Sequence, residues 1–163
     1  MIEKTLILLK PDAVQRCFCG EIISRFERAG LKIIGMKMVW VSKEQSKEHY
    51  KSHLEKPFYP GLEKFITQGP VLAMVLEGID TVEIVRKLVG STIPKEAQPG
   101  TIRGDYAHMS MQHANEKGKC VPNLIHASGN KEEAEYEINL WFTKKELHTY
   151  KTVHDVQTIL GDD

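Results

Sequence analysis

Apolar side chains recur along the chain in short blocks, and their spacing alternates between that of strands and that of amphipathic helices. Residues 5–9 form a continuous run of strand length, typical of a strand buried on both faces. The run ends at Lys10-Pro11-Asp12, because proline cannot donate to a sheet ladder. Residues 20–30 repeat at helical spacing. Residues 31–41 alternate with period two, which predicts a strand with one apolar face made of Ile34, Met36, Met38 and Trp40.

The second quarter of the chain predicts helices around another buried strand. Ser42 and Gln45 form a capping box, which opens a helix that residues 56–61 interrupt; a short second helix follows. Residues 71–76 form a continuous apolar run that predicts a buried strand. Asp80 begins what resembles a second capping box, so a further helix is expected there.

The remaining chain begins with a stretch of little periodicity. Residues 90–122 contain several glycines and prolines and are expected to form a long loop. A short strand near residue 125 and a helix capped by Asn130 then follow, and the inner face of this helix is expected to comprise Ala134, Ile138, Trp141 and Phe142.

This order of elements indicates an α/β or α+β sandwich, with helices packed on one sheet in a split βαβ arrangement. We expect a single domain over residues 1–163, with a long loop at residues 90–122 and a C-terminal extension at residues 143–163.

Composition narrows the class of protein. The chain has 22 basic and 22 acidic residues and a formal net charge of zero, which argues against binding nucleic acid by bulk positive charge. The longest apolar run, residues 71–76, is far shorter than the ~20 residues that span a bilayer. Three cysteines do not make a disulfide framework. We therefore expect a soluble, cytoplasmic protein without membrane partners.

The long loop has the composition of a phosphate site. Compact domains seldom keep a structureless stretch of this length unless it binds a ligand or is disordered. Guanidinium groups pair bidentately with phosphate oxygens, and glycines give access to the backbone. The alternative is a solvated surface loop. The sequence contains neither a P-loop nor a kinase glycine-rich motif, so a phosphate site here needs another design. The residues concerned are Arg86, Thr92, Lys95, Arg103, Lys117 and Lys119, with Gly90, Gly100 and Gly104.

His126 is the candidate nucleophile. It ends a short strand, small residues follow it, and Glu137 in the next helix is a candidate orienting carboxylate. A neutral imidazole can donate through one nitrogen while the other keeps a lone pair. The alternative is a purely structural histidine, which is how the other histidines are interpreted. Together with His126, the side chains of His108, His113 and Cys120 are of types that bind zinc, but their spacing fits no common zinc motif.

Seven stretches, in order across about residues 3–142, resemble the nucleoside diphosphate kinase family. Asn-x-x-His-[Ala/Gly]-Ser is the signature of that family and makes the resemblance specific. The stretches are Lys10-Pro-Asp-Ala-Val-Gln-Arg16, His49-Tyr50, Lys56-Pro-Phe58, Gln68-Gly-Pro-Val71, Pro99-Gly-Thr-Ile-Arg-Gly-Asp105, Asn123-Leu-Ile-His-Ala-Ser128 and Ala134-Glu-Tyr-Glu-Ile-Asn-Leu-Trp-Phe142.

The resemblance implies a ferredoxin-like βαββαβ core with an antiparallel sheet and a two-step phosphate shuttle. A nucleoside triphosphate, typically ATP, gives its γ-phosphate to the histidine matching His126, and a nucleoside diphosphate then collects it. It also implies Mg²⁺ bridging the nucleotide phosphates without dedicated protein ligands, and a homo-oligomer, either a tetramer or a hexamer.

The resemblance also assigns roles by position. Ser128 and Glu137 match the pair that supports the histidine. Phe58 matches the aromatic residue that stacks on the base, which reads no base edge and so implies a broad substrate range. Asn123, together with Lys10, matches the contact to the ribose 3′-hydroxyl. The positions that match residues near the phosphates are Lys10, Tyr50, Arg86, Thr92 and Arg103.

Three departures from the family pattern stand out. Gly129 replaces the usual aspartate and removes a possible helix cap, for which Asn130 can substitute; Ala13 replaces a common glycine. The connection from Asp105 to Asn123 spans 18 positions and is longer than usual. Its composition predicts that it is ordered and either lines the base side of the pocket or packs on a neighbouring subunit; the alternative is a flexible insertion. The alternatives to the kinase are a catalytically silent nucleotide-binding module on the same fold and a nucleic-acid-binding protein.

Overall fold

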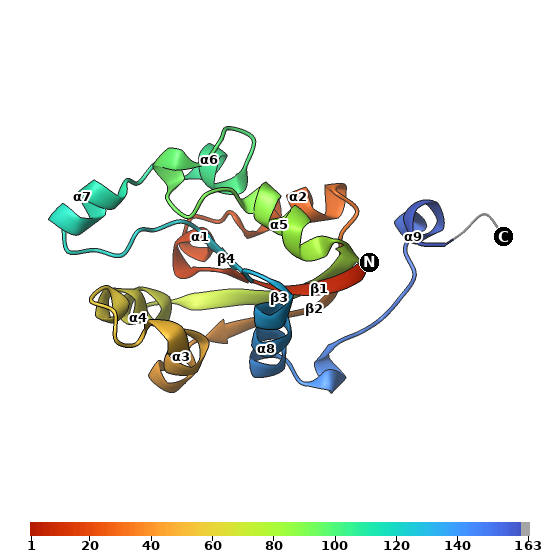
Figure 1. Ribbon diagram of the computed structural model, residues 1–163, viewed down its shortest axis with the longest axis horizontal. Coiled ribbons are helices and arrows are strands. Elements are labelled where there is room, and N and C mark those ends of the chain that lie inside the picture. The colour runs from red at the N-terminus through yellow and green to blue at the C-terminus, as the bar shows by residue number, and fades with distance from the viewer. Residues whose placement is uncertain (161–163) are drawn as a thin grey trace.

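A computed structural model describes residues 1–160 and contains one antiparallel sheet (Figure 1). Within those residues, four strands lie in the order β2-β3-β1-β4, and every pairing is antiparallel. This is the ferredoxin-like arrangement, which confirms the predicted fold class. The strands are β1 (Ile2–Leu9), β2 (Lys32–Trp40), β3 (Pro70–Ile79) and β4 (Ile125–Ala127).

The period-two geometry of β1 divides the interior into two cores. Leu6 and Leu8 belong to one buried cluster, whereas Ile7 and Leu9 belong to the other. Strand β1 therefore carries apolar residues on both faces, as its continuous apolar run predicted. Strand β3 is likewise buried along most of its length.

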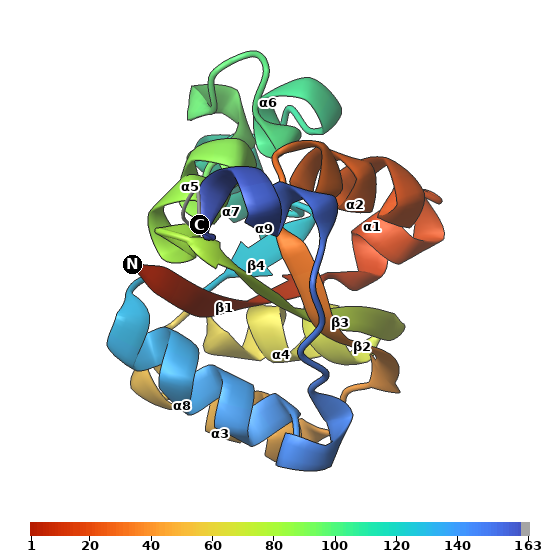
Figure 2. The ribbon, with the colours of Figure 1, turned by 90° about the vertical axis from the view of Figure 1, so that its right-hand side faces the viewer.

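Helices cover both faces of the sheet (Figure 2). On one face, α2 and α5 contribute Phe26 and Val85 to the core of Ile7 and Leu9. On the other, α8 contributes Trp141 to the core of Leu6 and Leu8. The helices flanking the sheet are α1 (Pro11–Gln15), α2 (Cys19–Arg28), α3 (Lys43–His49), α4 (Tyr59–Thr67), α5 (Thr81–Val89) and α8 (Lys131–Trp141).

Helix caps explain where several of these helices begin. The side chain of Ser42 accepts a hydrogen bond from the Gln45 amide at 3.1 Å, and Asn130 caps α8 in the same way, as predicted. The cap expected at Asp80 is wrong: this residue adopts φ +47° and its side chain makes no capping bond. The left-handed backbone turns the chain from β3 into α5 instead.

The prediction of a long loop at residues 90–122 is wrong where the structure has helical turns. This segment contains short helical turns, whose lengths are too small to show a helical period in sequence. Thr101 and Ser110 cap two of them through their hydroxyl groups. The turns are η2 (Pro94–Glu96), α6 (Ile102–Tyr106) and α7 (Met111–Glu116).

The apolar face predicted for β2 forms with three of its four residues, and Ile34 departs from it. A β-bulge between Ile33 and Gly35 shifts the register, so Ile34 is buried while the apolar side chains beyond it are not. Met36, Met38 and Trp40 are 45%, 60% and 67% exposed. These three side chains form an exposed apolar row on an edge strand.

The C-terminal extension crosses the start of β2. The His148 amide donates to the Ile34 carbonyl at 2.7 Å, and the Tyr150 hydroxyl donates to the Ile33 carbonyl at 2.7 Å. Lys32 pairs with Asp155 at 3.0 Å. Residues 161–163 of this extension lie outside the described part. None of the described helices is long and apolar enough to cross a bilayer. The other short elements are η1 (Lys51–His53), η3 (Lys144–Glu146) and α9 (Val153–Thr158).

Candidate active site

The predicted site residues gather at one end of the sheet, where β4 meets α5, α6 and α8. A narrow cavity of about 250 Å³ opens into a wider cleft of about 740 Å³, and His126 lines both. The narrow cavity is lined by Lys10, Arg86, Thr92, Arg103, Asn123 and His126, and the wider cleft adds Tyr50 and Phe58. Ser128 and Glu137 lie behind the histidine ring. All ten predicted residues therefore belong to one region.

A buried carboxylate fixes the orientation of His126. Its Nε2 atom lies 2.9 and 3.0 Å from the two carboxylate oxygens of Glu137, which reaches it from α8. The Ser128 hydroxyl donates to Glu137 Oε2 at 2.6 Å. A carboxylate can only accept, so in the neutral ring Nε2 carries the proton and Nδ1 keeps the lone pair. The His126 side chain is 21% exposed, which leaves the ring accessible from the cleft.

A second histidine, His49, packs against the first. The two rings meet edge to face with centroids 4.6 Å apart, and the Trp141 indole N–H donates to His49 Nδ1 at 3.2 Å. Burial, followed by the charge of His126, lowers the pKa of His49 well below its usual value. His49 is therefore a neutral ring beside His126. Sequence reasoning treated it as an ordinary structural histidine, although it stands in one of the motifs that carry the family resemblance.

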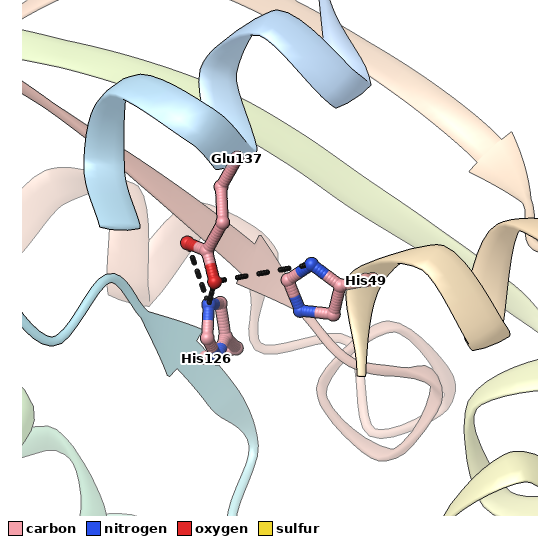
Figure 3. A group of neighbouring side chains, drawn as sticks. All are labelled: His49, His126 and Glu137. Atoms are coloured by element: carbon pink, nitrogen blue, oxygen red, sulfur yellow. Dashed lines mark hydrogen bonds and ion pairs between the residues drawn. The ribbon is translucent and has the colours of Figure 1, made fainter. Parts of the chain in front are cut away.

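His49, His126 and Glu137 together have the composition of a metal-binding group (Figure 3). Their donor atoms are already committed, however: Trp141 occupies His49 Nδ1, and the Glu137 carboxylate accepts from both Ser128 and His126. The three residues thus belong to one hydrogen-bond network, in which the buried Nε2 atom of His49 has no partner among residues 1–160. In the described part of the chain, the zinc set considered from sequence is not brought together.

Buried cations line the narrow cavity. Burial, followed by the charge of Arg103, lowers the pKa of Lys10 to about 8, and Lys10 Nζ donates to Asn123 Oδ1 at 2.8 Å. Burial and then the nearby Arg86 lower the pKa of Arg103 to about 10. Positive groups that are held together out of water favour an anionic ligand, because an anion relieves both their desolvation and their mutual repulsion.

Arg103 also holds the backbone of the site together. Its guanidinium donates to three carbonyl oxygens, those of Gly90 at 3.0 Å, Asn123 at 3.1 Å and Ile125 at 2.6 Å. Gly90 ends α5 with φ +87°, a conformation that suits glycine. One side chain thus links the end of α5 to the segment that carries His126.

The segment before His126 contains a strained residue. Leu124 has φ +70°, which is uncommon for a side chain of this size. Its carbonyl accepts from the Lys10 amide at 2.8 Å, and its amide donates to Asp12 Oδ2 at 3.0 Å. These bonds to the start of α1 hold the left-handed conformation and so fix Asn123 on one side of it and β4 on the other.

The wider cleft has an apolar wall and an unpartnered hydroxyl. Phe58 is 53% exposed at the start of α4, and Met111 on α7 lines the same cleft. Figure 1 shows α4 and α7 at the same end of the molecule. The buried Tyr50 hydroxyl finds no hydrogen-bond partner among residues 1–160, and burial raises the pKa of Tyr50 well above its usual value. Residues of the connection beyond Asp105, among them Met111 and Lys119, line this cleft.

The comparisons with known proteins agree with this geometry. The family model described as nucleoside diphosphate kinase matches residues 3–147. The nucleoside diphosphate kinase of Pyrococcus horikoshii is 52% identical over 153 residues, which are 94% of this chain and 93% of that protein. That of Pyrococcus abyssi is 51% identical over 153 residues, 94% of this chain and 92% of that protein.

Solved structures show the same likeness. The nucleoside-diphosphate kinase of Borrelia burgdorferi, a transition state mimic with bound vanadate and ADP, has a TM-score of 0.93 and 42% identity and covers 96% of each chain. That of Halobacterium salinarum in complex with CDP has a TM-score of 0.87 and 42% identity, covering 96% of this chain and 98% of that one. The chain belongs to the nucleoside diphosphate kinase family, and the activity of that family is its activity.

Proposed function

We propose that this enzyme moves the γ-phosphoryl group of a nucleoside triphosphate, typically ATP, to a nucleoside diphosphate through a phosphohistidine at His126 Nδ1. The lone pair on Nδ1 attacks the γ-phosphorus, and the nucleoside diphosphate leaves with the electrons of the broken P–O bond. In the second step, a terminal oxygen of another nucleoside diphosphate attacks the same phosphorus, and the N–P electrons return to Nδ1. The observation that carries this proposal is the bond from Nε2 to Glu137, which leaves Nδ1 unprotonated.

The cavity supports phosphoryl transfer because that reaction chiefly needs positioning and charge stabilisation. We assign Lys10, Arg86 and Arg103 to the negative charge of the phosphates, and the Thr92 and Tyr50 hydroxyl groups to their oxygen atoms. Arg103 keeps only part of its fork for a ligand, since three of its N–H groups are bound to carbonyls.

The nucleoside is assigned to the wider cleft. Phe58 presents an exposed ring on which a base can stack, and the connection that contains α7 forms the base side of the pocket. Asn123, together with Lys10, is assigned to the ribose 3′-hydroxyl.

Mg²⁺ is the divalent cation that we assign to the reaction. Among the described residues of the narrow cavity, Glu133 is the one carboxylate, and the others are cationic or neutral. Such a donor set does not make a cage for a resident ion, but it fits an ion that arrives on the phosphates and keeps most of its water. When bound, Mg²⁺ neutralises charge on the phosphate oxygens.

A homo-oligomer, either a tetramer or a hexamer, is also part of the proposal. The exposed apolar row of Met36, Met38 and Trp40 lies on an edge strand, and proteins normally cover such edges. A second copy of this chain can present the same row across a two-fold axis, so that like pairs with like.

Replacing His126 with alanine should abolish the phosphoenzyme while the fold remains intact, because the ring is partly open and contributes little packing. Labelling with γ-phosphate-labelled ATP measures this directly, and the wild-type label should be labile in acid and stable in alkali. His113→Ala, on the exposed face of α7, should keep the label. A catalytically silent binding module would bind ADP yet give no label in the wild-type protein.

Lys10 should make nucleotide binding depend on pH. In the protein without nucleotide, the pKa of Lys10 is about 8, and a bound phosphate raises it. Binding therefore takes up a proton at pH values between the pKa of the unbound state and that of the bound state. Affinity should be full below pH 8 and fall as the pH rises above it. Calorimetry with ADP at about pH 9, in two buffers of different ionisation enthalpy, should show uptake of at most about one proton. Lys10→Gln should remove the uptake, and a wild type without uptake contradicts the assignment.

Phe58→Ala should weaken the binding of all nucleoside diphosphates by similar amounts, on the order of 1–3 kcal/mol, because stacking is lost whichever base is present. Phe58→Tyr keeps the ring and serves as the control. Calorimetric affinities for ADP, GDP, CDP and UDP measure the effect. A loss confined to one base shows that Phe58 is not a general platform.

Met38→Lys should reduce the mass of the particle in solution, because a charge would be buried in the proposed contact. Light scattering gives the mass and distinguishes a wild-type tetramer from a hexamer. The control is Val153→Lys, on the exposed face of α9, which should leave the mass unchanged. A monomeric wild-type protein contradicts the assembly.

A further inference from the structure

Gly129 and Glu133 share one small volume at the start of α8. The Gly129 amide donates to Glu133 Oε2 at 2.9 Å. A Cβ atom at residue 129 would lie only 2.6 Å from that same oxygen, closer than real Cβ atoms approach. The carboxylate of Glu133 thus stands where a side chain at residue 129 would begin, and a larger residue there would have to displace it.

Glu133 is an exposed residue at the edge of the cationic cavity. Glu133 and Gly129 line the narrow cavity together with His126, Lys10 and Arg103. A negative charge at this place repels the phosphates of a bare nucleotide and weakens the field of the buried cations. The same charge attracts a divalent cation carried on the phosphates when that cation lies nearer to it than the phosphate oxygens do. Coulomb interactions therefore give Glu133 a different sign of effect on the two forms of the ligand.

We propose that Glu133 accepts hydrogen bonds from the water shell of the Mg²⁺ ion that the nucleotide carries, and thereby selects the magnesium complex over the free nucleotide. It supplies from the first turn of α8 the carboxylate that most of the family has at the position of Gly129. Mg²⁺ loses its water reluctantly and commonly uses only one or two carboxylates beside substrate phosphates. This inference rests on the proposed function, which brings a magnesium–nucleotide complex into the cavity.

A structural role for Glu133 makes a different prediction. The bond to the Gly129 amide satisfies a backbone donor beside the start of the helix, much as a capping side chain does. If that were its whole role, removing the charge would affect the stability of the free protein and would change the affinities for ADP and Mg·ADP alike.

Calorimetry of ADP binding, in Mg²⁺ and in EDTA, separates the two roles without relying on turnover. In the wild type, Mg²⁺ should strengthen binding. In Glu133→Gln this gain should fall by about tenfold, the size expected for losing one hydrogen bond to a charged group, while binding in EDTA stays equal or improves. Glu132→Gln is the matched control, since Glu132 lines the neighbouring groove between α5 and α8 but not the narrow cavity, and the variant should keep the gain. Melting temperatures without nucleotide verify that each variant is folded.

A reciprocal exchange tests the position itself. Gly129→Asp alone should bind poorly because the new side chain meets Glu133. Glu133→Ala alone should lose the magnesium gain, and the double variant Gly129→Asp with Glu133→Ala should recover it. An unchanged gain in Glu133→Gln overturns the inference, as do equal losses with and without Mg²⁺, or a wild type that shows no gain. Failure of the proposed function is separate, since it appears as a wild type without label on His126.

Discussion

The bond between the buried Glu137 carboxylate and His126 is the interaction on which the site depends. A carboxylate that is only 6% exposed is costly to bury unless its oxygens are paired, and here Ser128 and His126 supply the partners. The Ser128 hydroxyl also accepts from the Leu6 amide at 3.3 Å, so the network is anchored to the centre of the sheet. One proton on Nε2 is thereby fixed, and the chemistry of the opposite nitrogen follows from it.

The cationic half of the site also depends on buried charged groups that hydrogen bonds hold in place. Lys10 directly follows β1 and Arg103 lies in α6. Both side chains are buried, and both donate hydrogen bonds to Asn123. Their lowered pKa values express an electrostatic cost that the protein meets through backbone bonds, above all the three carbonyls held by Arg103. A polyphosphate reverses that cost. The site is in this sense built for a ligand with several negative charges, and its rigidity comes from carbonyl groups of the segment that precedes β4.

Parts of the fold and of the site were predictable from local pattern. The continuous apolar run of β1 fixed its burial on both faces, and the motifs brought the ten predicted residues into one region. The predictions failed where the spacing of apolar residues carries no information about the structure. The bulge between Ile33 and Gly35 exchanges the faces of β2 without changing the alternation in sequence. Helices such as α7, at six residues, are too short to show a period.

His49 and Glu133 show why the remaining part of the site needed coordinates. His49 becomes a neighbour of His126 only because α3 packs against α8, and its neutrality results from burial that no spacing reveals. Glu133 is exposed, and its carboxylate turns back to the Gly129 amide. The glycine that appeared in sequence as a lost cap is the residue that admits this carboxylate. Gly129 and Glu133 lie four residues apart, and the contact between them is a property of the folded turn.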